Sequence, residues 1–150
     1  MSACPRGWPS RSARPVGLWP ATFIEDADPA LQPLICPDEY GPAQQLANRL
    51  RQGFRTLMAG RGAQLAFGRT LPRLLRAAGL DAVQADAFFP ITSPACTALE
   101  IATVQQIRER LVAADLATEA EIEQHLSNVA SGRLDLATAP LISAWGRKPL

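Results

Sequence analysis

Apolar residues recur at helical spacing in several stretches of the chain. Between Ala43 and Ala59 they lie mostly three or four residues apart, which predicts an amphipathic helix with one apolar face: Leu46, Leu50, Phe54, Leu57 and Met58. Three arginines, Arg49, Arg51 and Arg55, fall mostly on the opposite face, where we expect solvent. Cap and spacing signals predict three more helices, over residues 70–79, 93–116 and 118–132. The apolar residues expected to face inward from the 93–116 helix are Leu99, Ala102, Val104, Ile107 and Leu111.

Three other stretches have the pattern of strands. In "DAVQADAFF", Val83, Ala85, Ala87 and Phe89 alternate with Gln84, Asp86 and Phe88, as the two faces of a strand do. Short apolar runs at 22–26 and 141–146 predict a strand on either side of the helical segments. The order strand, helix, helix, strand, helix, helix, strand indicates an α/β chain that ends on a strand.

Irregular segments separate these elements. Residues 1–21 combine Pro, Arg, Ser, Gly and Trp without a period and are expected to form an irregular or disordered tail, with the folded part over 22–150. Four prolines, Pro29, Pro33, Pro37 and Pro42, keep residues 29–42 extended. "GRG" at 60–62 resembles a phosphate loop, but it follows a helix and lacks the third glycine, so a helix C-terminus is the favoured interpretation.

Composition and charge narrow the class of protein. The 150 residues are 47% hydrophobic and 19% charged with a net charge of +1, which is typical of one soluble domain and lacks the basic excess of nucleic-acid-binding proteins. No apolar run is long enough for a membrane span. Three cysteines, Cys4, Cys36 and Cys96, are far apart and favour neither a disulfide framework nor a zinc site. We therefore expect a cytoplasmic protein with buried or unreactive thiols.

Few residues have the pattern of a catalytic group. Glu25, Asp26 and Asp28 follow a predicted strand, and such a tip is either a solvated turn or the border of a ligand or cation site. Arg69 precedes Thr70 at a predicted helix start, where it is either an exposed arginine or a group that receives an anion. The single histidine, His125, lies in a polar stretch, which favours a surface or half-buried structural role over general-base catalysis or a Cys–His pair.

Four segments in order resemble the C-terminal part of class I S-adenosylmethionine-dependent methyltransferases, of the bacterial small-molecule type. They are "FIEDADPALQPLICPD", "LANRLRQGFRTLMAGRG", "AFGRTLPRLLRAAGLDAVQADAFFPITSP" and "LDLATAPLISAWGRKP". The most telling features are the strand that ends in acids, the "LLRAAGL" helix that turns directly into a strand, and the closing "SAWGRKP". The resemblance covers about residues 22–149.

The resemblance implies a partial Rossmann-like sheet. Residues 22–26, 83–89 and 141–146 would match the fifth, sixth and seventh strands, of which the seventh is antiparallel and inserts between the other two. The helices of about 93–132 would form a cap on the substrate side, where Asp26, Asp28, Tyr40 and Arg69 are the candidate acceptor-binding residues.

The departure from the family concerns the methyl donor. The family binds it on a glycine-rich loop after the first strand and an acidic ribose ligand after the second, and this sequence matches neither. We therefore expect no cofactor-binding residue and no metal ligand in this chain, although S-adenosylmethionine is the cofactor of the full-length family. Alone, the chain is expected to be inactive.

Three functions stay open at this point. The first is a truncated or split methyltransferase-like protein that acts on a small molecule; a remnant, half of a split enzyme and a mis-started reading frame all fit it. The second is a non-enzymatic binding or interaction module. The third is a small independent enzyme that uses the acidic tip and a metal. The strand at 22–26 would lack a neighbour, so self-association or a complementary chain is expected there.

Overall fold

The structure is a computed structural model in which residues 21–149 are described. The predicted tail lies outside this part, apart from Ala21, with which the first strand begins. The elements follow in the order β1 (Ala21–Ala27), α1 (Pro42–Gly60), a 3-10 turn (Gly68–Thr70), α2 (Leu71–Ala77), β2 (Asp81–Phe88), α3 (Pro94–Ala113), α4 (Glu119–Ala130) and β3 (Leu141–Arg147). This confirms the type and order of every predicted element.

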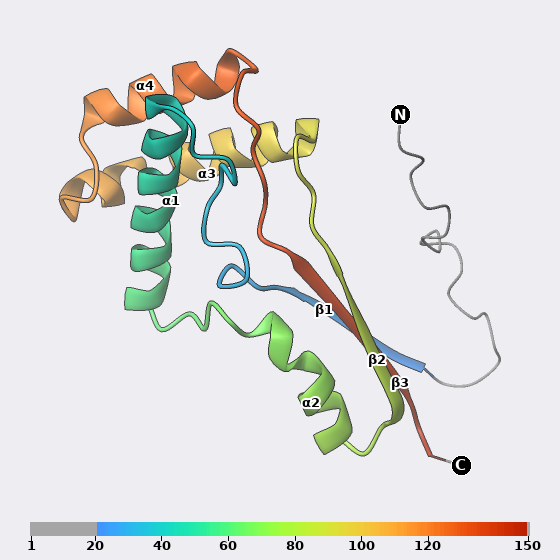
Figure 1. Cartoon of the computed structure of the whole chain (residues 1–150). Coiled ribbons are helices and arrows are strands. Elements are labelled where there is room, and N and C mark those ends of the chain that lie inside the picture. The colour runs from blue at the N-terminus through green and yellow to red at the C-terminus, as the bar shows by residue number, and fades with distance from the viewer. Residues whose placement is uncertain (1–20, 150) are drawn as a thin grey trace, which may run out of the picture.

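The three strands form one sheet in the order β1-β3-β2 (Figure 1). β3 is antiparallel to both neighbours and pairs its Ala144 with Ile24 on one side and with Ala85 on the other. β1 and β2 therefore run parallel to each other and are the outer strands within residues 21–149. The prediction that the last strand is antiparallel and lies between the other two is confirmed.

α2 packs against one face of this sheet. Leu71, Leu75 and Leu80 are buried against Ile142 and Ala144 of β3. A tight turn of residues 78–80 then leads into β2, and within it the N–H of Leu80 donates to the C=O of Leu75 at 3.1 Å and closes the end of the helix. Among the helices of residues 21–149, only α2 packs on the strands.

β2 is exposed along most of its length. Only Val83 is partly buried, and it packs with Leu80 and Ala144 beside α2. The other residues predicted to share the face of Val83, including Ala85 and Ala87, are exposed. With seven residues, α2 is about 10 Å long and too short to cover the whole strand. The alternation of apolar and polar residues thus predicted the strand correctly, but the apolar side of the strand is not buried.

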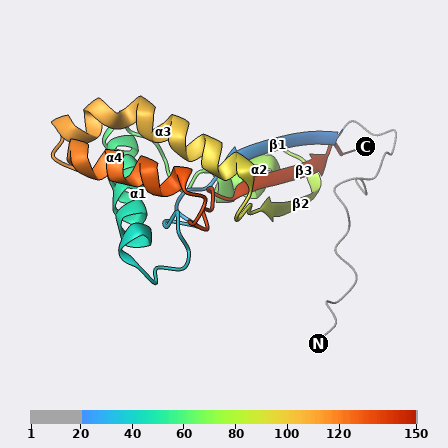
Figure 2. The same ribbon diagram turned by 90° about the horizontal axis from the view of Figure 1, so that it is seen from above.

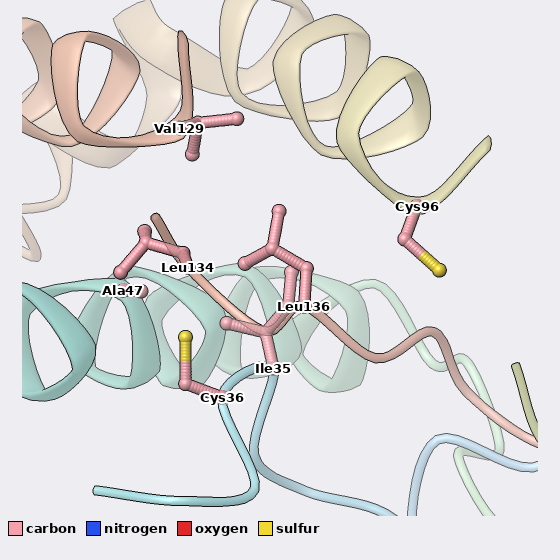
Figure 3. Close-up of a cluster of buried hydrophobic side chains, with 7 residues drawn as sticks. All are labelled: Ile35, Cys36, Ala47, Cys96, Val129, Leu134 and Leu136. Carbon is pink, nitrogen blue, oxygen red and sulfur yellow. The ribbon is translucent and has the colours of Figure 1, made fainter. Parts of the chain in front are cut away.

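The other three helices form a separate helical unit, made of α1, α3 and α4, which pack on one another. The unit lies beyond the end of the sheet toward which β1 and β2 run (Figures 1 and 2). Two clusters of buried apolar residues form its core. One is shown in Figure 3, where loops 28–41 and 131–140 contribute beside the helices: Ile35, Cys36, Ala47, Cys96, Val129, Leu134 and Leu136. The predicted two-helix cap is therefore a three-helix unit that includes α1.

Two helix faces differ from the prediction. In α3, Leu99 is 53% exposed and Ala102 is also exposed, whereas Cys96 and Glu100 point into the core with Val104. The buried face of α3 still has helical spacing and consists of Cys96, Glu100, Val104, Ile107 and Leu111. It is rotated from the predicted face and includes the charged Glu100, which a pattern of hydrophobic residues does not identify. On α1, the Arg51 side chain is only 17% exposed because it binds Glu100.

The starts of α3 and α4 and the end of α1 follow the sequence signals, whereas Thr70 before α2 makes no side-chain cap bond. Thr118 and Glu121 form the predicted capping box at the start of α4, and the Ser93 hydroxyl accepts from the Ala95 N–H at the start of α3. At the end of α1, Gly62 has φ +83°, and the N–H of Ala63 donates to the C=O of Met58 at 3.1 Å. This arrangement ends a helix. The interpretation of "GRG" as a helix C-terminus is confirmed.

Candidate functional site

A hollow of about 360 Å³ lies at the carboxyl end of β1. One wall comes from the end of β1 and the turn after it, and the other comes from the last turn of α1 and the loop before α2. The lining residues are Asp26, Ala27, Pro29, Met58, Ala63, Gln64, Leu65 and Phe67. Most of these side chains are apolar, and the only charged one in this set is Asp26.

Asp28, in the turn after β1, and Arg69, in the 3-10 turn before α2, form a bidentate ion pair. Arg69 donates from Nε to Oδ2 and from Nη2 to Oδ1 of Asp28, both at 2.8 Å. The backbone N–H groups of Arg69 and Leu31 also donate to this carboxylate, at 2.9 and 3.1 Å. The Asp28 side chain is fully buried, and the hydrogen bonds from Arg69 lower its pKa although burial alone would raise it.

Other contacts hold the two walls together. The N–H of Ala30 donates to the C=O of Leu65 at 3.1 Å, which joins the turn after β1 to the loop before α2. Gly68 passes so close to β1 that a Cβ atom there would lie 3.0 Å from the carbonyl oxygens of Asp26 and Ala27. A side chain at position 68 would require β1 or the loop to shift by a few tenths of an ångström, so glycine favours this close approach.

The structure divides the four predicted binding residues. Asp28 and Arg69 bind each other, and four hydrogen bonds occupy the buried carboxylate, while the Arg69 side chain stays 46% exposed. Asp26 is exposed on the wall of the hollow, and its Oδ1 accepts from the Ala27 N–H at 2.7 Å. Tyr40 is 74% exposed and lies before the opposite end of α1, a helix about 27 Å long. Asp26 is thus the only one of the four at the hollow.

A second cluster of polar residues, which sequence reasoning missed, lies inside the helical unit. Glu100 of α3 is 2% exposed and binds His125 of α4 and Arg51 of α1. The distances are 2.8 Å from Glu100 Oε1 to His125 Nε2 and 2.5 Å from Oε2 to Arg51 Nη2. The carboxylate therefore ties all three helices together.

The prediction that His125 lies at the surface or is half-buried is wrong, since its side chain is fully buried. Its Nε2 lies 2.8 Å from the Glu100 carboxylate, and its Nδ1 has no hydrogen-bond partner within residues 21–149. The signal for burial was helical spacing, because His125 lies three residues after Ile122 and four before Val129, on the same buried face of α4. Its polar sequence neighbours lie on the other faces. A group sealed from solvent in this way is structural.

The two cysteines in the described part are both buried and free. Burial, with smaller contributions from nearby Glu100, Asp135 and Glu39, raises the pKa of the Cys36 thiol to about 11. A thiol with such a pKa stays protonated and is a poor nucleophile at neutral pH. The expectation of buried thiols is confirmed for Cys36 and Cys96.

Neither a metal centre nor a membrane span is found in residues 21–149. No three His, Cys, Asp or Glu side chains gather there in a way that would hold a metal ion. None of the helices in that range combines the length and the apolar character that crossing a bilayer requires. No protein-family model matches this chain, and no curated protein matches it either.

Proposed function

We propose that residues 22–149 are the C-terminal part of a class I S-adenosylmethionine-dependent methyltransferase that acts on a small molecule. The observation that carries the proposal is the strand order, in which an antiparallel last strand separates two parallel strands. The resemblance in sequence implies the same arrangement. The tight turn from α2 into β2 supports the proposal further, because the "LLRAAGL" segment implied a helix followed closely by a strand.

Within such an enzyme, this chain supplies the acceptor side. The carboxyl ends of β1 and β2 run toward the helical unit, and ligands of open α/β sheets lie outside these ends. The hollow beside Asp26 occupies this position at β1. Methyl transfer depends mainly on holding donor and acceptor in line, so the task of these residues is to orient the acceptor.

The methyl donor does not fit the described residues. The segments that follow β1 and β2, residues 28–41 and 89–93, contain a single glycine, Gly41, and no pair of glycines that would let a backbone approach the donor. The first acid after β1, Asp28, is buried against Arg69, whereas Asp26 lies within β1 and lines the hollow. The chain alone is therefore expected to be inactive, and the donor site must come from residues outside it.

A longer reading frame tests the proposal. The DNA upstream should encode, in one of three frames, a strand followed by a GxGxG loop, and the joined protein should bind S-adenosylmethionine with micromolar affinity in calorimetry. The present chain should show no binding, and alanine at the middle glycine of the new loop should abolish it in the joined protein. Micromolar binding by the present chain alone would refute the proposal, and the absence of such a frame upstream would favour the non-enzymatic candidate.

A non-enzymatic binding module is the second candidate, and the hollow favours it. All of its lining residues belong to this chain, so a ligand needs no donor half in order to bind. This candidate predicts ligand binding without methyl transfer, even after the chain is supplied with an upstream segment. A methyltransferase assay on the joined protein separates the two functions.

A further inference from the structure

We propose that the hollow at the end of β1 binds a small aromatic amine, with the cationic nitrogen at Asp26 and the ring on Met58, Leu65 and Phe67. This inference rests on the proposed function only where it identifies the amine as the methyl acceptor. The binding itself depends on the described residues alone.

The size and the lining of the hollow indicate the kind of ligand. Its volume of about 360 Å³ lies at the lower end of the range of about 300–1,000 Å³ that is usual for small-molecule sites. Its surface is mostly apolar, and Phe67, which is 37% exposed, presents an aromatic ring. Such a surface suits one ring with a short side chain.

The charge of the hollow favours a cation. Asp28, the next acid along the chain, is neutralised by Arg69, so the charge that faces the ligand is that of Asp26. An ionised carboxylate has about four lone-pair positions, and the Ala27 N–H uses one of them at Oδ1. A protonated amine can donate to the remaining positions, whereas a ligand carboxylate would be repelled.

The walls are fixed before any ligand arrives. The bond from Ala30 to Leu65, the ion pair between Asp28 and Arg69, and the close approach of Gly68 join both sides of the hollow. A site that needs no ordering on binding loses less of the interaction free energy to conformational entropy.

Titration with 2-phenylethylamine, followed by ¹H–¹⁵N correlation spectra, tests the inference. Amide shifts are expected to concentrate at residues 26–30 and 63–67. Two matched ligands serve as controls: 2-phenylethanol, which lacks the charge, and 3-phenylpropanoate, which reverses it. The expected order of affinity is amine, then alcohol, then carboxylate.

Two variants make the charge argument specific. Asp26→Asn should weaken amine binding about fivefold, as expected for loss of an exposed ion pair, and should leave alcohol binding unchanged. Asp38→Asn makes the same chemical change at an exposed acid before the far end of α1 and should have no effect. Equal affinity for the three ligands, shifts outside the hollow, or no saturable shifts at millimolar amine would overturn the inference. None of these outcomes affects the test with the longer reading frame.

Discussion

The helical unit and the sheet differ in what holds them together. The helical unit contains two clusters of seven buried apolar residues each, whereas the sheet and α2 share one cluster of five. The helical unit also buries a charged group, Glu100, with partners from all three helices. By contrast, β2 is exposed over most of its length and is held chiefly by its pairing with β3.

This difference shows that a sequence can specify a secondary-structure element clearly even where few of its side chains are buried. A strand such as β2 is specified by its alternation and by its partner β3, and it gains little from the hydrophobic effect in the described part. The helical unit instead depends on packing and on its buried polar contacts. Three substitutions test the comparison.

The largest effect is expected from Glu100→Ala. It leaves His125 buried without its carboxylate partner and removes the anchor of Arg51, which should lower the free energy of unfolding by about 3–5 kcal/mol. Urea denaturation followed by circular dichroism measures the change. Glu109→Ala, an exposed position on the same helix, is the control and should stay within about 0.5 kcal/mol of the wild type. Equal effects of the two would mean that the buried cluster does not hold the helices together.

The apolar core of the helical unit is tested by Leu111→Ala. Leu111 is fully buried and lies beside Gly53 of α1, so its truncation should lower the unfolding free energy by about 2–5 kcal/mol. Leu99→Ala makes the same change in the same helix at an exposed position and should have an effect of at most about 0.5 kcal/mol. Thermal melts of both variants decide the point. A large loss for Leu99→Ala would show that the face first predicted for α3 is the packed one.

The smallest effect, and the one that changes with pH, is expected from Asp28→Asn beside the sheet. Because the folded-state pKa of Asp28 is lowered, its contribution to stability is present above the unfolded-state value of about 4 and is lost as the pH falls through the folded-state value. At pH 7 the variant should be less stable by about 1–3 kcal/mol, and the difference should shrink in acid. Denaturation at several pH values between neutral and strongly acidic measures it. A difference that is constant over that range would mean that the pair with Arg69 does not form.

The sequence predicted the elements well because their signals are local. Proline at the first turn of α3, the capping box at Thr118 and the glycines after α1 and α2 act within a few residues, so each marks a terminus without knowledge of the fold. The antiparallel position of β3 was available only through the resemblance, since no local pattern sets the order of strands.

The site was predicted less well because it depends on side chains that are distant in sequence. Arg69 lies 41 residues from Asp28, and no local pattern predicts that they pair. Asp26 is exposed and Asp28 is buried, although the two acids lie only two positions apart in one acidic stretch. Glu100 and His125 were missed because their polarity argues for the surface, although their helical positions indicated the core.

The connections between the sheet and the helices bear on how this architecture can change in evolution. The N–H of Thr92, before α3, donates to the C=O of Leu136, after α4, at 2.8 Å, and Ile91 pairs with Ala137. The two ends of the α3–α4 segment therefore lie side by side, as they do in an insertion between two paired strands. Such a segment can be exchanged for another of different length without re-routing β2 or β3. By contrast, α1 joins β1 to α2, so its replacement would alter both walls of the hollow.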